Sequence, residues 1–551
     1  MTPAELSALL HSALLDAVRA GEVALDEADV PEPKVERPRQ REHGDWATNV
    51  AMQLGKKAGT TPRALAETLA ARLRAADGIA EVDVAGPGFL NIRLAAGAAG
   101  ELARTVLTQG ADYGRGDALA GEVMNLEFVS ANPTGPLHIG HTRWAALGDA
   151  LVRLLRAAGA RVTPEYYVND AGAQMDKFGA SILARAEGTE VPEDGYHGAY
   201  VSELAAQVAE RNPGLGALPH EEAVALAREE GYTLQLAELQ EVLAAFNVHF
   251  DVWFSERNLH DSGAVESAVE RLRAQGHVYD EGGAVWLRTT DFSDDKDRVL
   301  IRSDGTPTYF AADAAYYLSK KDRGFDRKIY LLGADHHGYV NRLKAIASCA
   351  GDDPERNIEV LIGQLVSVAG ARMSKRAGNI IELRDLIAWI GTDAVRYTLA
   401  RYPADSPLTL DGDKLREQND ENPVYYVQYA HARTCNVARN ADAHGVTREG
   451  GIAFDPAALN HPADEELLAT IGRYPEVVAL GAQLREPHRV ARYLEDLATA
   501  YHAWYGQCRV TPRGEEPVTA GHVARRWLND ATTRVLANGL DLLGVSAPER
   551  M

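Results

Sequence analysis

Two histidines three residues apart, His138 and His141, are the side chains of this sequence best suited to chemistry on a phosphate. They lie in the segment ANPTGPLHIGH, which spans residues 131–141. At the start of a helix, this spacing places both imidazoles on one face. They could then donate hydrogen bonds to an α-phosphate as it becomes five-coordinate and gains charge. The alternative is that they only cap the helix or lie satisfied in the core.

The residues around the histidines are ordered as strand, loop and helix. Val123–Val129 is an apolar run of strand length, and a loop rich in proline and glycine follows it. Thr142–Ala158 then carries leucines at helical spacing and ends before Gly159. This order directs backbone N–H groups and a helix N-terminus toward a phosphate.

A second basic segment, RMSKR, spans residues 372–376 and is followed by Gly378 and Asn379. Glycine and asparagine at this position indicate a loop. A lysine on such a loop, Lys375, can neutralise a departing pyrophosphate as a point charge. A solvated surface loop is the alternative interpretation.

The two segments together resemble the paired HIGH and KMSKS signatures of the class I aminoacyl-tRNA synthetases. The resemblance implies a Rossmann-type catalytic domain in which His138, His141 and Lys375 are catalytic. It implies ATP as a substrate, with Mg²⁺ held mainly by phosphates and water, no protein metal site and no prosthetic group. The residues that it assigns to ATP binding are Pro136, Gly140, Met373, Ser374 and Gly378.

Three further residues favour a cationic substrate. Tyr309 and Asp313 are four residues apart, so on a helix they share a face. Glu127 and Asp313 could present two carboxylates to one guanidinium, whose planar fork suits bidentate partners. Tyr309 could add a hydroxyl acceptor. A strand-edge charge at Glu127 and an exposed helix face at the other two positions are the alternatives.

Longer segments resemble the arginyl-tRNA synthetases over nearly the whole chain. They are FVSANPTGPLHIGHTRWAALGDAL (128–151), DVWFSE (251–256), KDRVLIRSDGTPTYFAADAAYY (296–317), GADHHGYV (333–340), GTDAVRY (391–397) and NPVYYVQYAHAR (422–433). The resemblance implies activation of arginine by ATP and its transfer to tRNA. The arginine site that it implies comprises Glu127, Asn132, Tyr309, Asp313, Asp335 and His336.

Both ends of the chain resemble the tRNA-binding regions of this family. In the N-terminal region, Phe89 could stack on an unpaired base and Asn91 could read its edge. In the C-terminal region, Tyr425, Tyr429 and Arg433 follow one another at helical spacing, a pattern suited to stacking and phosphate contact. The C-terminal Met551 is expected near the anticodon. Core packing is the alternative for each of these aromatic residues.

Composition indicates an ordinary globular protein of several domains. The chain has 551 residues, a formal net charge of −22 and three cysteines with no CxxC pair, which argues against disulfides and a cysteine-based zinc site. No apolar run approaches the ~20 residues of a membrane span. The acidic N-terminal segment does not resemble a signal peptide. We therefore expect a cytoplasmic protein, and we expect a monomer.

The expected fold is an α/β catalytic domain between two tRNA-binding domains. We place an N-terminal α+β domain at 1–112, the catalytic domain at 113–400 with a helical insertion at about 173–283, and an all-α anticodon-binding domain at 401–551. Two other functions remain open at this point. One is a class I synthetase for another amino acid, such as cysteine, and the other is a non-catalytic RNA-binding paralogue.

Overall fold

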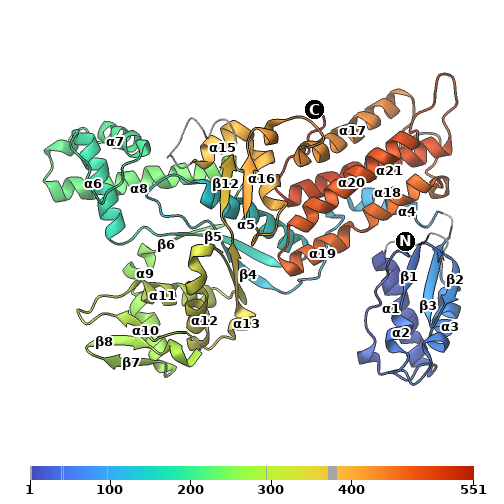
Figure 1. The fold of residues 1–551 in the computed structure, drawn as a ribbon, viewed down its shortest axis with the longest axis horizontal. Coiled ribbons are helices and arrows are strands. Elements are labelled where there is room, and N and C mark those ends of the chain that lie inside the picture. Colours follow the sequence, from blue (N-terminus) through green and yellow to red (C-terminus); the bar gives the residue numbers. More distant parts are fainter. Residues whose placement is uncertain (1–2, 39, 41–42, 96, 293, 370–380) are drawn as a thin grey trace.

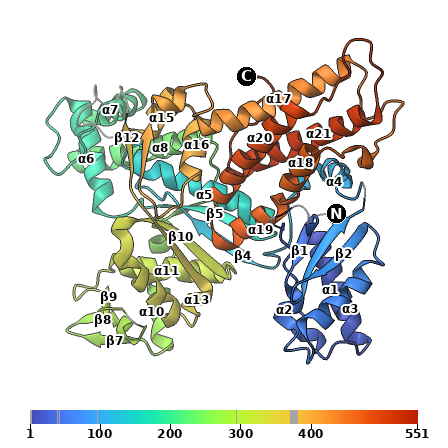
Figure 2. The same ribbon diagram turned by 45° about the vertical axis from the view of Figure 1, so that its right-hand side comes forward.

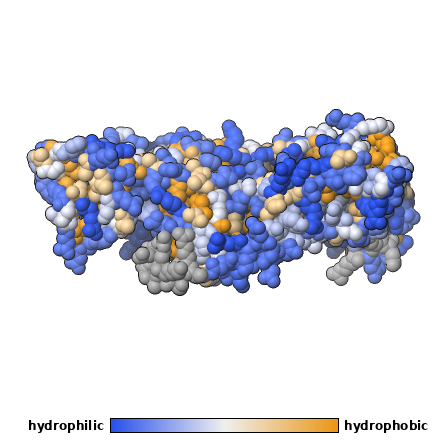
Figure 3. All heavy atoms as spheres, turned by 90° about the horizontal axis from the view of Figure 1, so that it is seen from above, coloured by the Kyte–Doolittle hydropathy of each residue, from blue (hydrophilic) through white to orange (hydrophobic). Residues whose placement is uncertain are grey.

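The computed structural model describes residues 3–38, 40, 43–95, 97–292, 294–369 and 381–551. Figures 1 and 2 show an elongated molecule with the catalytic sheet near its centre. The N-terminal domain lies below the C-terminal helices, and both are remote from a helical group at the other end. On the face seen in Figure 3 most residues are hydrophilic, and the apolar ones gather in small separate patches. Among the described residues, no helix has the length and apolar character that crossing a membrane requires.

The N-terminal domain packs helices against a three-stranded antiparallel sheet of order β1-β3-β2. Its core is separate from the others and contains Leu10, Leu69 and Ile92. Its helices and strands are α1 (Pro3–Arg19), β1 (Trp46–Thr48), α2 (Val50–Leu54), α3 (Pro62–Leu73), β2 (Ile79–Ala85) and β3 (Phe89–Leu94).

The next helix, α4 (Glu101–Gln109), packs against the C-terminal helices instead. Its buried residues Leu102, Ala103 and Val106 belong to the large core that joins the catalytic and C-terminal domains. The connection between the N-terminal core and this larger core therefore comes before α4.

The catalytic domain is built on a five-stranded parallel sheet of order β11-β10-β4-β5-β6. The order changes direction between β4 and β10, because the strands that follow β4 continue on one side and those that follow β10 on the other. In open α/β sheets, ligands bind at the carboxyl ends of the strands beside such a switch point. The strands are β4 (Val123–Glu127), β5 (Arg161–Val168), β6 (Val252–Ser255), β10 (Arg327–Gly333) and β11 (Ile358–Gly363).

The helices of this domain surround the sheet and position its loops (Figure 1). They are α5 (Ile139–Ala157), α9 (Arg257–Asp261), α10 (Ala264–Ala274), α11 (Tyr309–Asp322), α12 (Val340–Cys349), α13 (Pro354–Asn357), α15 (Leu383–Ile390) and α16 (Thr392–Ala400). A separate antiparallel sheet contains β7 (Val278–Glu281), β8 (Ala284–Leu287) and β9 (Arg298–Ile301). A two-stranded parallel pair joins β12 (Val366–Ala369) and β13 (Leu408–Asp411).

The helical insertion differs in extent from the expected range of about 173–283. The helices α6 (Ala173–Glu187), α7 (Ala199–Arg211) and α8 (His220–Ala245) form a group with its own core. The chain then returns to the main sheet at β6, which pairs with β5. The sequence VWFS of this strand is only four residues long, too short for a periodic pattern to reveal it inside a helical stretch.

The C-terminal domain is a bundle of helices with a large apolar core, which includes Leu497, Trp504 and Leu536. Its helices are α17 (Pro423–Ala443), α18 (Pro462–Gly472), α19 (Tyr474–Leu484), α20 (His488–Gln507) and α21 (Ala520–Leu542). An ion pair of 2.8 Å between Arg37 and Glu466 links the N-terminal domain to α18.

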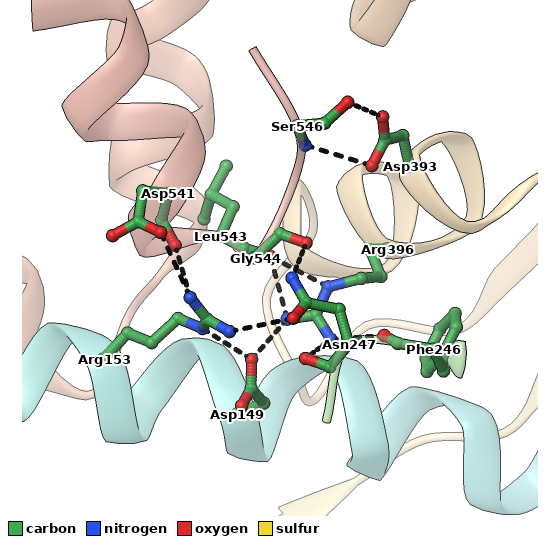
Figure 4. A network of polar contacts seen from close by, with 10 residues as sticks. All are labelled: Asp149, Arg153, Phe246, Asn247, Asp393, Arg396, Asp541, Leu543, Gly544 and Ser546. Carbon is green, nitrogen blue, oxygen red and sulfur yellow. Dashed lines mark hydrogen bonds and ion pairs between the residues drawn. The ribbon is translucent and has the colours of Figure 1, made fainter. Parts of the chain in front are cut away.

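A buried arginine connects the catalytic and C-terminal domains (Figure 4). Arg396 of α16 has a fully buried side chain and pairs with Asp149 of α5 at 2.6 Å. It also donates to the backbone oxygens of Phe246 at 2.9 Å and Leu543 at 3.0 Å. The guanidinium of Arg396 thus connects α5, the end of α8 and the segment that follows α21.

Further hydrogen bonds connect the side chains around Arg396. Arg153 donates to Asp149 at 2.7 Å and to Asp541 at 3.2 Å. The side-chain amide of Asn247 donates to the backbone oxygen of Gly544 at 2.9 Å. We call Asp149, Arg153, Asn247, Arg396 and Asp541 the interdomain cluster.

Candidate active site

The loop after β4 is held in an unusual backbone conformation. Val129 and Ser130 both have positive φ, 68° and 40°, a region that residues other than glycine rarely adopt. The loop is anchored to β5, because the Ser130 hydroxyl accepts from the Tyr167 N–H at 3.0 Å and the Tyr166 hydroxyl donates to the Ala131 oxygen at 2.9 Å. Local strain maintained by surrounding contacts is typical of functional sites.

The two histidines cap α5 with their side chains. His138 is the N-cap residue, and its Nδ1 accepts from the Gly140 N–H at 3.1 Å. The Nδ1 of His141 accepts from the His138 N–H at 3.4 Å, which completes a capping box. The two ring centres are 4.0 Å apart. Helix capping, which the sequence left as an alternative to chemistry, is therefore one of their roles.

Capping fixes which ring nitrogen carries the proton. A neutral imidazole that accepts through Nδ1 has its hydrogen on Nε2. Burial lowers the pKa of His138, and burial together with the neighbouring His138 lowers that of His141 to about 4. Both rings are consequently neutral near pH 7, and each keeps one N–H donor on Nε2.

Gly140 lets the His138 ring take this position. A Cβ atom added to Gly140 would lie 2.9 Å from Cε1 of His138 and 3.1 Å from its Nδ1. Any larger residue would therefore displace the ring. Pro136 lies in the same loop, two residues before His138.

The histidine loop also pairs with the chain that follows the second basic segment. The Ile139 N–H donates to the Ile381 oxygen at 3.0 Å, and the Leu383 N–H donates to the Leu137 oxygen at 2.7 Å. Arg372, Met373, Ser374, Lys375 and Gly378 lie outside the described residues.

A cavity of about 1020 Å³ opens between the carboxyl ends of β4 and β10. His138, Gly140 and His141 contribute to its wall, and so do carboxylates and tyrosines from six other segments. The polar residues of that second group are Glu127, Tyr167, Glu256, Tyr309, Asp313, Tyr316, Tyr330 and Tyr339. The site therefore combines imidazole donors with acidic groups at the switch point of the sheet.

Three carboxylates make part of this cavity strongly acidic. Burial raises the pKa of Asp313 to about 7, and the charges of Glu256 and Glu127 add to the effect, although the Tyr339 hydroxyl donates to this carboxylate. Burial also raises the pKa of Glu256. These groups would be stabilised in their ionised form by a cation bound in the cavity.

Glu127 differs from the other two carboxylates because it is paired with a buried lysine. Its Oε2 accepts from Nζ of Lys320 at 2.6 Å, and the lysine side chain is fully buried. Glu127 is the last residue of β4, and its side chain is 12% exposed at the cavity.

The structure brings Glu127, Asn132, Tyr309 and Asp313 around one cavity. Tyr309 is 64% exposed, which agrees with the alternative interpretation of an exposed helix face. Asp313 is partly buried in the cavity wall, which does not agree with it. Asp335 and His336 belong to the short helix Ala334–Tyr339 at the end of β10, and their side chains lie outside the described ones.

Sequence reasoning assigned no role to Glu256 or Lys320. Glu256 ends the DVWFSE segment directly after β6, at the edge of the sheet where parallel strands present functional residues. Lys320 follows Asp313 by seven residues, two helical turns along the same face of α11. The position of Glu256 after a strand and the spacing of Lys320 from Asp313 were both visible in the sequence. Neither pattern indicated which distant residues these side chains would contact.

The candidate tRNA-contacting residues lie in two domains, on β3 of the N-terminal domain and on α17 of the C-terminal domain. Phe89, at the start of β3, is 40% exposed, and Asn91 is half-buried on the same strand. On α17 the rings of Tyr425 and Tyr429 stack with centres 5.8 Å apart. The Arg433 guanidinium lies 4.6 Å from the centre of the Tyr429 ring.

Other groups complete the surface around α17. Arg433 also donates to the Tyr429 hydroxyl at 2.8 Å and contacts Nδ1 of His502 at 3.0 Å. Met551 is 54% exposed at the end of the chain. These rings pack against one another at the surface, so stacking on a base and packing within the domain are compatible here.

Comparisons with known protein families cover most of the chain. A family model described as the arginyl tRNA synthetase N terminal domain matches residues 4–94. The model for the class I (R) tRNA synthetase catalytic domain matches residues 104–191 and 223–398, and the DALR anticodon binding domain matches residues 427–551.

Individual proteins give the same result over the full length. The chain is 63% identical to an arginine–tRNA ligase of Paenarthrobacter aurescens over 552 residues and 64% identical to one of Micrococcus luteus over 559 residues, and each comparison covers 100% of both chains. The fold matches the Thermus thermophilus arginyl-tRNA synthetase with a TM-score of 0.75 at 24% identity, over 98% of this chain and 99% of the other. The two-motif resemblance is thus confirmed, and the chain belongs to the arginyl-tRNA synthetase family of class I aminoacyl-tRNA synthetases.

Proposed function

We propose that this protein is an arginine–tRNA ligase with the reaction centre in the cavity described above. The arginine carboxylate attacks the α-phosphorus of ATP, and pyrophosphate leaves, which gives arginyl-adenylate. The terminal adenosine of the tRNA then takes the arginyl group, and AMP is released. The observation that carries this proposal is one cavity with neutral imidazole donors and a surplus of carboxylates, in a chain of this family.

At the amino-acid end of the cavity, the carboxylates accept hydrogen bonds from the N–H groups of the guanidinium. Asp313 and Glu127 are the proposed partners, and the Tyr309 hydroxyl adds an acceptor at the mouth of the cavity. Asn132 holds the α-amino or carboxylate end of arginine. Asp335 and His336 lie beside the substrates.

At the nucleotide end, the two Nε2 donors face the charge that develops on the α-phosphate. They need no reorganisation during the reaction because the capping box already fixes both rings. Pro136 and Gly140 shape the loop at the phosphates. Met373, Ser374 and Gly378 complete the ATP site, and Lys375 neutralises the pyrophosphate. Mg²⁺ arrives with ATP as part of the substrate.

The surfaces on β3 and α17 hold the tRNA. Phe89 and Asn91 contact its elbow, and Tyr425, Tyr429, Arg433 and Met551 contact its anticodon region. Half-buried aromatic rings beside an arginine suit stacked bases and phosphates. We also propose that the protein acts as a monomer and in the cytoplasm, where its tRNA substrate is used.

Aminoacylation of total tRNA with each amino acid tests the proposal. Only arginine should be charged at a substantial rate. Without editing, the kcat/KM for lysine should be lower than that for arginine by ~10⁴ or more, because the lysine ammonium leaves acceptors that are placed for a guanidinium unpaired. Canavanine, which keeps the guanidino fork, should compete far better than lysine. Equal competition by lysine and canavanine would contradict the assignment.

The order of events can be tested with the same enzyme. If tRNA binding completes the catalytic site, pyrophosphate exchange with arginine should be nearly absent until tRNA is added. Full exchange with enzyme, ATP, Mg²⁺ and arginine alone would refute this part of the proposal.

Lys375 offers a test of the nucleotide end. We expect Lys375→Ala to lower the activation rate by about 10²–10³, as loss of a single electrostatic donor does elsewhere. Lys414→Ala is a suitable control because that lysine side chain is 78% exposed, in the short 3-10 helix Lys414–Arg416. A near-normal Lys375→Ala would show that the loop assignment is wrong.

A further inference from the structure

A buried ammonium lies directly behind the acidic wall of the cavity. Lys320 lies near the end of α11 with a side chain that is 0% exposed. Its Nζ lies 4.3 Å from the centre of the Tyr316 ring and 4.1 Å from that of Tyr330. Both tyrosines and Glu127 line the cavity. The lysine is therefore one layer behind the surface that a substrate would touch.

The surroundings compensate the cost of burying this charge. An ammonium removed from water needs close opposite charge and hydrogen bonds to be stable. Glu127 supplies both at 2.6 Å, and the two aromatic faces add cation–π attraction. Glu165 also lies in the field of Lys320, but Arg323 and the Tyr316 hydroxyl bind that carboxylate directly. Lys320 is thus matched chiefly to Glu127.

This pairing restricts how Glu127 can meet a ligand. A carboxylate has two oxygens, and Oε2 of Glu127 is already committed to the lysine. Oε1 is then the atom available to the cavity. The lysine also offsets one of three negative charges, because Glu127 shares the wall with Asp313 and Glu256.

We propose that Lys320 is a positioning residue for arginine recognition, which turns Oε1 of Glu127 toward the guanidinium and lowers the negative charge of the pocket by one. This inference rests on the proposed role of Glu127 in holding the arginine side chain. Lys320 does not touch the substrate, so it acts through Glu127 and shapes binding more than the chemical step.

Four variants test this role in the full-length enzyme with tRNA, ATP and Mg²⁺. Lys320→Met keeps the length of the side chain and removes its charge, Lys320→Arg keeps the charge, Glu127→Gln removes the carboxylate, and a double variant combines Glu127→Gln with Lys320→Met. We expect Lys320→Met to raise the KM for arginine about 10–100-fold, the value of one charged hydrogen bond. The kcat should change less than about threefold, the KM for ATP should not change, and Lys320→Arg should restore most of the arginine affinity.

The double variant separates action through Glu127 from a general structural effect. If Lys320 acts through Glu127, the double variant should bind arginine no worse than Glu127→Gln alone. It should also melt at a higher temperature than Lys320→Met, because no buried carboxylate is then left without its partner. An additional loss of arginine affinity greater than about tenfold, beyond that of Glu127→Gln, would contradict the proposal.

The pH profile supplies a readout that a structural role would not change. Without the lysine, the remaining acidic groups lose a nearby cation and protonate more readily. The acid limb of kcat/KM for arginine should therefore move to higher pH in Lys320→Met and stay in place in Lys320→Arg. An unmoved acid limb in Lys320→Met would count against the proposal.

The outcomes distinguish this inference from the function on which it rests. A normal arginine KM in folded Lys320→Met, with a crippled Glu127→Gln, would overturn the role of Lys320 and leave the arginine site intact. A normal KM in Glu127→Gln would overturn the assignment of Glu127 as well. If Lys320→Met does not fold, the double variant gives the decisive comparison with Glu127→Gln.

Discussion

The acidic part of the cavity, which is the proposed arginine pocket, and the interdomain cluster both contain buried charge, but they satisfy it differently. In the interdomain cluster, Arg396 donates to a carboxylate at 2.6 Å and to three backbone oxygens. In the pocket, burial raises the pKa of Asp313 to about 7, and the charges of Glu256 and Glu127 add to the effect. The first region pairs its buried arginine with a carboxylate, whereas the second pairs Glu127 with Lys320 but contains two further carboxylates, Asp313 and Glu256.

This difference separates a structural site from a binding site. A satisfied charged network stabilises one arrangement of the chain and gains nothing from a ligand. A pocket with surplus negative charge is less stable when empty and gains from a bound cation. Removal of a charge should therefore damage function in the pocket and stability in the interdomain cluster.

The largest expected effect is on activity, from Asp313→Asn. The substitution removes one of the two proposed carboxylate partners of the guanidinium, so kcat/KM for arginine should fall by about 10³-fold or more. The melting temperature should stay the same or rise, because an unfavourably buried charge is removed. Asp322→Asn on the same helix is the control, since that side chain is 56% exposed. A loss below about tenfold in Asp313→Asn would show that the surplus charge does not serve arginine.

The next largest effect is on stability, from Asp149→Ala. Arg396 and Arg153 would lose their shared carboxylate in a buried setting, which should cost about 3–5 kcal/mol in the free energy of unfolding. Urea denaturation measures this change, and the arginine KM of the folded enzyme should stay within about threefold of normal. The control, Asp541→Ala, should cost less than about 1 kcal/mol because its side chain is 67% exposed. Equal losses in the two variants would remove the basis for treating the cluster as a structural site.

A smaller loss of stability should follow from Gly544→Ala. A Cβ atom at Gly544 would overlap Nη2 of Arg396, and the residue has a φ of +65°. Overpacking and backbone strain together should cost about 2 kcal/mol. Gly514→Ala is a matched control, because it has a φ of +54° and nothing within 4 Å of the added atom. The difference between their unfolding free energies isolates the contact with Arg396, and no difference would contradict the close packing of the cluster.

The smallest effect is the pH dependence of arginine recognition. Asp313 attracts a guanidinium only when ionised, and its pKa is about 7 in the folded protein. The KM for arginine should therefore rise about tenfold between pH 8 and pH 6. Because this pKa is raised on folding, the neutral carboxyl stabilises the empty protein at low pH, and that contribution is lost as the pH rises through about 7. The increase in melting temperature caused by arginine should consequently be larger at pH 8 than at pH 6.

Much of the catalytic frame could be predicted from local patterns. The strand, loop and helix around His138 and His141 were visible because apolar periodicity, prolines and glycines act over short distances. The cavity also brings together Glu127, Tyr309 and Asp313, which the sequence connected only through one helical spacing and a resemblance. Strand β6 was missed because four residues inside a helical stretch carry too little periodic signal.

The charge partners could not be predicted, for a different reason. Lys320 and Glu127 are 193 residues apart, and Arg396 and Asp149 are 247 residues apart. Sequence spacing shows which side chains share a helix face but not which distant strand or helix that face will meet. The depressed pKa of His141 likewise depends on burial, which is a property of the folded chain.

The most direct test of the account is the number of protons that arginine releases when it binds to the enzyme. Calorimetry at pH 7 in buffers of different ionisation enthalpy gives this number. Arginine should release about half a proton, because a carboxyl with a pKa of about 7 must ionise fully to hold the guanidinium. In Asp313→Asn that release should disappear. No proton release from the unmodified enzyme, or an equal release from Asp313→Asn, would contradict the claim that the surplus negative charge of this pocket binds the arginine side chain.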